Sequence, residues 1–312
     1  MTNDVVILTG VYYDYRGSKP ISMRDDEAPH YRTAGSYQIA WHLRNHDISV
    51  QVVDFIQFMT SEQIEAYIRK FIHKDKPAII GLSTSFFVYK QGYMPANILD
   101  AVTRIKQDYP LVKLIAGGAN AATINIKKNL IDYTIYSYSE DVTLDLFEGL
   151  LGKKKLKLEY KLTNKLFKEN TKFDITNCSH RFHKEDCIRP EESLPLEISR
   201  GCIFKCRFCR YPYIGKKKND YIRTIDEIED ELLYNYEHFR TTNYYVLDDT
   251  FNETPTKVKE FYEMTQRLPF KIQYCAYLRA DLIHRFPETA LWLRDSGLVA
   301  AFFGIESFHP EA

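Results

Sequence analysis

The chain has 312 residues, of which 45% are hydrophobic and 27% are charged, a composition typical of a globular protein and not of a disordered one. Lys and Arg together number 42, as do Asp and Glu, so the charge balance gives no reason to expect a nucleic acid or an anionic membrane as partner. No apolar run reaches the roughly 18–20 residues of a membrane-spanning helix. The N-terminal residues lack the basic segment of a signal peptide, so we expect a cytoplasmic protein.

Strand and helix patterns alternate over residues 1–151. The predicted strands are short and apolar, and they cover residues 5–8, 50–55, 78–83, 112–116 and 132–136. The predicted helices cover residues 33–45, 61–72, 96–107 and 140–150. Apolar strands connected by helices indicate an α/β domain with a doubly wound parallel sheet of the flavodoxin or Rossmann type.

The carboxyl ends of such strands are where ligands of doubly wound sheets bind. Ser83 is the last residue of the third predicted strand, and Gly117 and Gly118 follow the fourth. We take these three residues as candidate cofactor contacts. Small residues at strand ends are also ordinary turn formers, so the pattern alone does not select a ligand.

Residues 152–192 are polar and show no long periodic run, and we interpret them as a linker. Within them, Cys178, His180, His183 and Cys187 have the chemistry of metal ligands. Their order matches none of the common zinc patterns, so a surface loop is the favoured interpretation.

Residues 193–312 predict a second series of strands and helices. The expected strands are 194–199, 243–247, 272–278 and 299–305. Thr224 and Glu227 form a capping box before one helix, Thr254 and Pro255 begin the next, and Gly297 ends a third. Four units cannot close an eight-stranded barrel, so we expect the N-terminal portion of a (β/α) barrel, either as a fragment of a longer protein or as a naturally truncated form.

A loop after the first of these strands carries three cysteines in eight residues, Cys202, Cys206 and Cys209. Clustered cysteines in a chain without an export signal indicate a metal site and not disulfides. Zinc takes four protein ligands, or three and an open catalytic position, and iron–sulfur clusters normally take four thiolates. Three thiolates therefore suggest a cluster with one iron open to a ligand that is not protein.

The cysteine loop resembles the signature of the radical S-adenosylmethionine (SAM) superfamily, C-x3-C-x-aromatic-C, in which Phe208 is the aromatic residue. The resemblance extends over Leu194–Glu306, through Leu-Asp-Asp-Thr-Phe-Asn, Tyr-Leu-Arg-Ala-Asp-Leu and Phe-Gly-Ile-Glu-Ser. The first half is similar to the cobalamin-binding domain that precedes the barrel in one class of these enzymes, at Val50–Asp54, Ile79–Ser83 and Leu114–Ala119.

The resemblance implies that the three cysteines hold a [4Fe-4S] cluster whose fourth iron binds SAM. Reduction of the cluster, by an electron donor such as flavodoxin or ferredoxin, then cleaves SAM to methionine and a 5′-deoxyadenosyl radical. The radical abstracts hydrogen from an unactivated carbon of a substrate that is a small molecule or is unknown. By position, Phe208 would lie near the adenine. The candidates for holding the amino acid or ribose end of SAM are Asp248 or Asp249, Arg279 and Glu306. Each of these residues could instead form a helix cap or a salt bridge at the rim of the barrel.

Cobalamin is a further cofactor on which the sequence leaves alternatives open. Residues 10–17 contain no Asp-x-His-x-x-Gly motif, so no histidine there would bind cobalt, and residues 136–140 carry tyrosine and serine where relatives carry glycine. Three hypotheses follow. The chain belongs to a cobalamin-dependent methyltransferase, to a radical SAM enzyme that performs hydrogen abstraction, rearrangement or oxidation without cobalamin, or to a non-catalytic metal-binding fragment.

Overall fold

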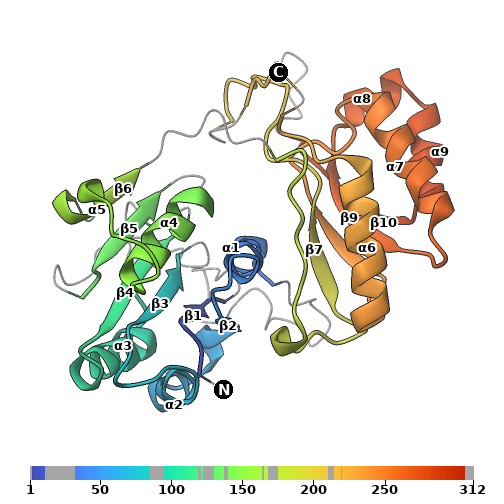
Figure 1. The fold of residues 1–312 in the computed structure, drawn as a ribbon. Helices are drawn as coiled ribbons and strands as arrows, with labels where there is room; N and C mark the ends of the chain where they lie inside the picture. The colour runs from blue at the N-terminus through green and yellow to red at the C-terminus, as the bar shows by residue number, and fades with distance from the viewer. Residues whose placement is uncertain are drawn as a thin grey trace. The chain divides into compact units, whose positions relative to one another are not determined.

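A computed structural model of the protein describes residues 2–10, 32–84, 94–118, 121, 130–136, 140–163, 165–167, 175–209, 214–218 and 220–305. The chain divides into two compact units (Figure 1). The first unit comprises residues 1–171 together with 182–187, and the second comprises residues 172–181 together with 188–312. Within the described ranges, none of the helices combines the length and the apolar composition required to span a lipid bilayer.

The first unit is built on a parallel six-stranded sheet in the order β2-β1-β3-β4-β5-β6 (Figure 1). Its strands are β1 Val5–Leu8, β2 Val50–Val53, β3 Ala78–Ser83, β4 Val112–Gly117, β5 Tyr133–Tyr136 and β6 Lys165–Phe167. The order of the first five strands is that of flavodoxin-like doubly wound sheets. The predicted fold class of the first half is therefore confirmed, and the burial of the apolar residues of β1 and β2 explains their continuous apolar pattern.

The main helices of the first unit are α1 Ala34–Arg44, α2 Ser61–Phe71, α3 Ala96–Asp108 and α4 Glu140–Leu150. The apolar sides of α2 and α3 share one buried cluster with Val6, Leu8 and Ile80 of the sheet, whereas α1 and α4 lie on the other face (Figure 1). The cap of α2 is Thr60, one residue before the predicted start of the helix. Its hydroxyl accepts from the Gln63 backbone, while the Gln63 side chain accepts from the Thr60 backbone.

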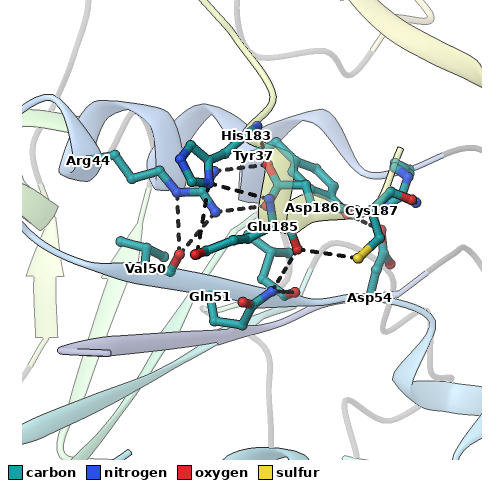
Figure 2. A network of polar contacts seen from close by, with 11 residues as sticks. Tyr37, Arg44, Val50, Gln51, Asp54, His183, Glu185, Asp186 and Cys187 are labelled. Atoms are coloured by element: carbon teal, nitrogen blue, oxygen red, sulfur yellow. Dashed lines mark hydrogen bonds and ion pairs between the residues drawn. The ribbon is translucent and has the colours of Figure 1, made fainter. Parts of the chain in front are cut away.

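Residues 152–192, predicted as a linker, contain the helix α5 Leu158–Leu162 and the strand β6, which pairs in parallel with β5. The stretch 182–187 belongs to the first unit, and Figure 2 shows the polar contacts around it. Arg44 donates from Nη2 and Nη1 to the Asp186 carboxylate at 2.7 and 2.9 Å, and the Asp186 side chain is fully buried. Gln51 Nε2 donates to the Glu185 carbonyl at 3.2 Å. The buried Asp186 therefore anchors this stretch to the first unit, while Lys184, Glu185 and Cys187 are exposed.

The four residues considered as a zinc set in the same region divide between the two units. Cys178 and His180 belong to the second unit, and His183 and Cys187 belong to the first. His180 Nε2 is 3.0 Å from the Glu197 carboxylate, so its ring already has a protein partner.

The second unit is built on a parallel four-stranded sheet in the order β10-β9-β8-β7. Its strands are β7 Ser193–Glu197, β8 Asn243–Leu247, β9 Gln273–Leu278 and β10 Leu298–Phe303, and its helices are α6 Ile225–Phe239, α7 Pro255–Arg267, α8 Ala280–Arg285 and α9 Glu288–Asp295. Each strand is hydrogen-bonded to the next in chain order, with helices between them (Figure 1). This arrangement is the partial (β/α) barrel that the sequence predicted.

The Thr224 and Thr254 caps predicted for the second unit are present, but the predicted capping box is not complete, because the Thr224 backbone N–H donates to the Thr176 carbonyl at 2.8 Å. The Thr224 and Thr254 hydroxyls accept from the backbone N–H groups of Glu227 and Lys257, and Pro255 is the first residue of α7. The buried face of α6 carries polar residues, Glu231 and Asn235, beside Ile228 and Leu232. An apolar pattern does not reveal a buried charge that has a partner, here Arg223 at 2.7 Å from Glu231.

Candidate functional site

The cysteine loop begins two residues after Ser199, beyond the carboxyl end of β7. Its two sides are joined by backbone hydrogen bonds from Gly215 to the Phe204 carbonyl and from Lys216 to the Cys202 carbonyl, at 2.9 and 3.0 Å. A side chain at Gly201 would meet carbons of Lys216 at 2.9 Å, so the close approach of the two sides of the loop favours glycine there. Residues 201–204 and 214–216 are thus held close together.

The three thiols differ in exposure. Cys202 is buried, and burial raises the pKa of its thiol, whereas Cys206 and Cys209 are half-exposed. Throughout the described residues, no group of three His, Cys, Asp or Glu side chains lies close enough to hold a single metal ion. A four-iron cluster separates its thiolate ligands further than one ion does, and three soft thiolates on one loop have the donor chemistry that such a cluster requires. The donor set fits the cluster, and the ligand assignment stays a prediction.

The turn after β8 lies beside the cysteine loop and carries Asp248, Asp249 and Thr250. The Thr250 hydroxyl is 3.4 Å from Cys202 Sγ and donates to the Asp249 carbonyl at 2.8 Å. Asp248 is buried, and its carboxylate accepts from the Thr250 backbone at 2.9 Å. Asp249 is exposed. Asp248 is therefore engaged in the fold, and Asp249 is the one whose side chain is accessible to a ligand.

A buried cation supports this turn. Lys257 Nζ, on the first turn of α7, lies 2.6 Å from the Asp248 carboxylate and 2.8 Å from the Glu253 carboxylate. Burial lowers the pKa of Lys257, but the two carboxylates outweigh it and raise that pKa above its usual range. The lysine therefore stays charged and holds two acidic residues beneath the site.

The end of β9 brings Arg279 to the same loop. Its Nη1 donates to Cys206 Sγ at 3.6 Å, its guanidinium carbon lies 4.1 Å from the centre of the Phe204 ring, and its Nη2 donates to Asp281 at 2.8 Å. That hydrogen bond from Arg279 lowers the pKa of Asp281. The Asn252 side chain accepts from the Arg279 backbone at 2.9 Å and donates to its carbonyl at 3.0 Å, which joins the turns after β8 and β9.

The remaining predicted residues have varied positions. The Phe208 side chain is 62% exposed, so it is accessible to a ligand. Glu306 lies outside the described residues. In the first unit, Ser83 and Gly117 are register partners at the carboxyl ends of β3 and β4, and Gly118 has φ +103°, a conformation that favours glycine. The structure thus brings the first-unit candidates to one edge, and it brings Asp248, Asp249 and Arg279 to the cysteine loop.

Sequence reasoning missed the residues that support the cysteine loop. Thr250 and Asn252 lie within the Leu-Asp-Asp-Thr-Phe-Asn motif but received no predicted role, and Lys257 was expected only as part of a helix. A usable signal was present, because polar residues that directly follow a buried strand lie at the carboxyl edge of the sheet.

Residues 196–312 match the sequence profile described as the radical SAM superfamily. This part of the chain is a radical SAM domain. Its cysteine loop and the turns after β8 and β9 are the features described above, and they all fall within the matched residues. No curated protein matches the chain at a significant level.

Among solved structures, the chain is similar to the cobalamin-dependent SAM radical enzyme OxsB with aqua-cobalamin bound, at 18% identity and a TM-score of 0.69 over 98% of this chain and 44% of OxsB. It is also similar to the radical SAM methyltransferase TsrM from Kitasatospora setae, with tryptophan and a SAM analogue bound, at 13% identity and a TM-score of 0.59 over 99% of this chain and 60% of TsrM. At these identities the likeness establishes the fold, and the chain spans less than two thirds of either protein.

Proposed function

We propose that the protein is a radical SAM enzyme in which Cys202, Cys206 and Cys209 hold a [4Fe-4S] cluster and SAM binds at the same edge of the second sheet. When bound, the cluster supplies the low-potential electron that cleaves SAM to methionine and a 5′-deoxyadenosyl radical. The observation that carries this proposal is the convergence of the cysteine loop with the turns after β8 and β9 inside the matched radical SAM domain.

The residues of the chain would bind and orient SAM from these turns. Asp249 is exposed beside the buried Thr250 and can accept hydrogen bonds from an amino or ribose group. Asp281 already occupies one side of the Arg279 guanidinium, so Arg279 would contact the SAM carboxylate with its remaining donors. The accessible ring of Phe208 would stack on the adenine.

Anaerobic reconstitution of the chain with iron and sulfide tests this function. We expect about four irons per chain, an absorbance band of a [4Fe-4S] cluster, and 5′-deoxyadenosine after reduction in the presence of SAM. Replacement of the three loop cysteines by alanine should abolish iron binding, whereas C275A, which changes a buried cysteine in β9, should retain it. A wild-type chain that binds no iron would refute the proposal. A chain that binds iron but yields no 5′-deoxyadenosine would favour a non-catalytic metal-binding fragment.

We propose that the first unit binds cobalamin. In that case the enzyme would transfer a methyl group to an unactivated carbon or phosphorus centre. Small residues occupy the carboxyl edge of its sheet, where Ser83, Gly117 and Gly118 are all partly exposed, and OxsB, which has a similar fold, binds aqua-cobalamin. Titration of the full chain with aqua-cobalamin tests this. We expect saturable binding that S83W weakens, with S61A, on the helix α2, as control. Absence of binding in the wild type would favour an enzyme that uses the radical without cobalamin.

The partners belong to the same proposal. The reduction step requires an electron donor such as flavodoxin or ferredoxin, and the reaction requires a small-molecule substrate that the described residues do not identify. We propose the cytoplasm as the location, because a low-potential iron–sulfur cluster is stable in a reducing compartment.

A further inference from the structure

Two side chains that are not cluster ligands lie within hydrogen-bonding reach of two cysteine sulfurs. The Thr250 hydroxyl is 3.4 Å from Cys202 Sγ, and the Arg279 guanidinium donates to Cys206 Sγ at 3.6 Å. They come from different strand ends, after β8 and β9, and they reach different sulfurs. Polar groups around a metal thiolate adjust its electronic properties without binding the metal.

We infer that Thr250 and Arg279 are positioning residues that donate hydrogen bonds to the ligand sulfurs of Cys202 and Cys206 and thereby raise the reduction potential of the cluster. This inference rests on the proposed function, since it requires that the loop hold the cluster. It gives a role to Thr250 and Arg279, neither of which is needed as a ligand of the cluster.

The Thr250 hydroxyl has two acceptors within reach. With Cys202 as a thiol, it donates to the Asp249 carbonyl at 2.8 Å and can accept from the thiol. A thiolate carries negative charge and is a stronger acceptor than a neutral carbonyl, so the hydroxyl proton is expected to turn toward Sγ when Cys202 is a ligand. The site is buried, which strengthens such a hydrogen bond relative to one in water.

The turns that carry both donors are fixed by buried contacts. Asp248 accepts from the Thr250 backbone at 2.9 Å and is paired with Lys257 at 2.6 Å. The two hydrogen bonds between Asn252 and the Arg279 backbone connect the turn of one donor to the turn of the other. The donors are therefore preorganised and do not have to be ordered when the cluster forms.

The effect of both donors has the same sign. Reduction adds one negative charge to the cluster, which its sulfurs share, and a hydrogen bond or a nearby cation stabilises the more negative state. Loss of a donor should therefore disfavour reduction. We expect about a tenfold fall in the reduction equilibrium constant for each donor lost, which corresponds to a potential about 59 mV more negative for a one-electron couple.

The test is a redox titration of the reconstituted full chain with dithionite and viologen mediators in the absence of SAM, followed by the electron paramagnetic resonance signal of the reduced cluster. The variants T250V and R279Q each remove one donor. T265V and R267Q, on α7, are the matched controls. The Thr265 hydroxyl donates to the Tyr262 carbonyl at 2.7 Å, as the Thr250 hydroxyl donates to a carbonyl. Arg267 pairs with the Glu229 carboxylate, as Arg279 pairs with that of Asp281. T250S keeps the hydroxyl and should restore the wild-type potential.

The outcomes separate this inference from the proposed function. A wild-type chain without iron overturns the proposed function and this inference with it. Full iron content in every variant, with potentials equal to that of the wild type, overturns the inference and leaves the proposed function intact. An unchanged potential in R279Q would overturn the part of the inference that concerns Arg279, whether or not the variant binds SAM more weakly. If T250V does not retain the cluster, T250A, which also lacks the hydroxyl, provides the measurement.

Discussion

The buried cation beneath the site provides the sharpest stability prediction. Lys257 lies between the buried Asp248 and Glu253 carboxylates, at 2.6 and 2.8 Å, and forms an ion pair with each. In K257M the apolar part of the side chain is retained, but two carboxylates remain buried without this cation. Breaking a buried ion pair by removal of one partner costs about 3–5 kcal/mol. We therefore expect K257M to lower the free energy of unfolding of the second unit by about 3 kcal/mol or more.

A matched control lies two residues along the same helix. Lys259 is 54% exposed and pairs with Glu263 at 3.5 Å, so K259M should change the free energy of unfolding by less than about 0.5 kcal/mol. The chain has two tryptophans, Trp41 in the first unit and Trp292 on α9 of the second. Urea unfolding in a W41F background therefore reports on the second unit alone, through the fluorescence of Trp292.

The pH dependence provides a second check on K257M. The pKa of Lys257 is raised in the folded state, so the stability that its charge contributes is present below its usual pKa of 10.5 and is lost as the pH rises above that value. The deficit of K257M relative to the wild type should therefore persist at about pH 8 and shrink as the pH rises above 10.5. Equal stability of K257M and K259M at about pH 8 would show that the triad is solvated, and the reasoning would be refuted.

Two further predictions concern the second unit. Burial alone would raise the pKa of Glu197, but the charges of Arg200 and His180 outweigh burial and hold that pKa well below 4.5. The stability that this carboxylate contributes is therefore present above pH 4.5 and is lost as the pH falls below that value. E197Q should therefore be less stable than the wild type by about 2–3 kcal/mol at neutral pH, with the difference shrinking in acid, as measured by urea unfolding with E237Q as an exposed control. Gly297 has φ +106°, and a side chain there would collide with the Ile272 carbonyl. G297A should therefore cost more than about 2 kcal/mol in the same assay. The control is G152A in the first unit, where a side chain meets no atom within 4 Å, followed through Trp41 in a W292F background, and a cost of G297A equal to that of G152A would contradict this explanation.

The order of elements could be predicted because each long helix and buried strand carries its own pattern. β3 and β8 have the predicted bounds, and α7 begins with the predicted Thr254 cap. β6 was missed because three residues give no periodicity, and only pairing with β5 makes them a strand. The place of residues 182–187 was missed because the Arg44–Asp186 ion pair joins residues far apart in the sequence. Local patterns carry no information on such contacts.

The candidate site shows the same division between local and non-local information. Three cysteines in eight residues are a local signal, and the sequence located them. Glu253 lies just before α7, and Lys257 lies four residues later on that helix. This spacing is typical of an exposed ion pair, yet both residues are buried in the structure. Their burial depends on the packing of α7 against the sheet, which the sequence pattern could not supply.

The burial of polar residues also separates two of the predicted SAM contacts. Asp248 and Asp249 were equivalent candidates in the sequence, because both directly follow β8. Asp248 already has Lys257 and the Thr250 backbone as partners, so a contact with SAM would have to break a buried ion pair. The Asp249 side chain is exposed, so a ligand can reach it while the Asp248–Lys257 ion pair stays intact. The energetic difference therefore favours support of the turn as the role of Asp248 and ligand contact as the role of Asp249.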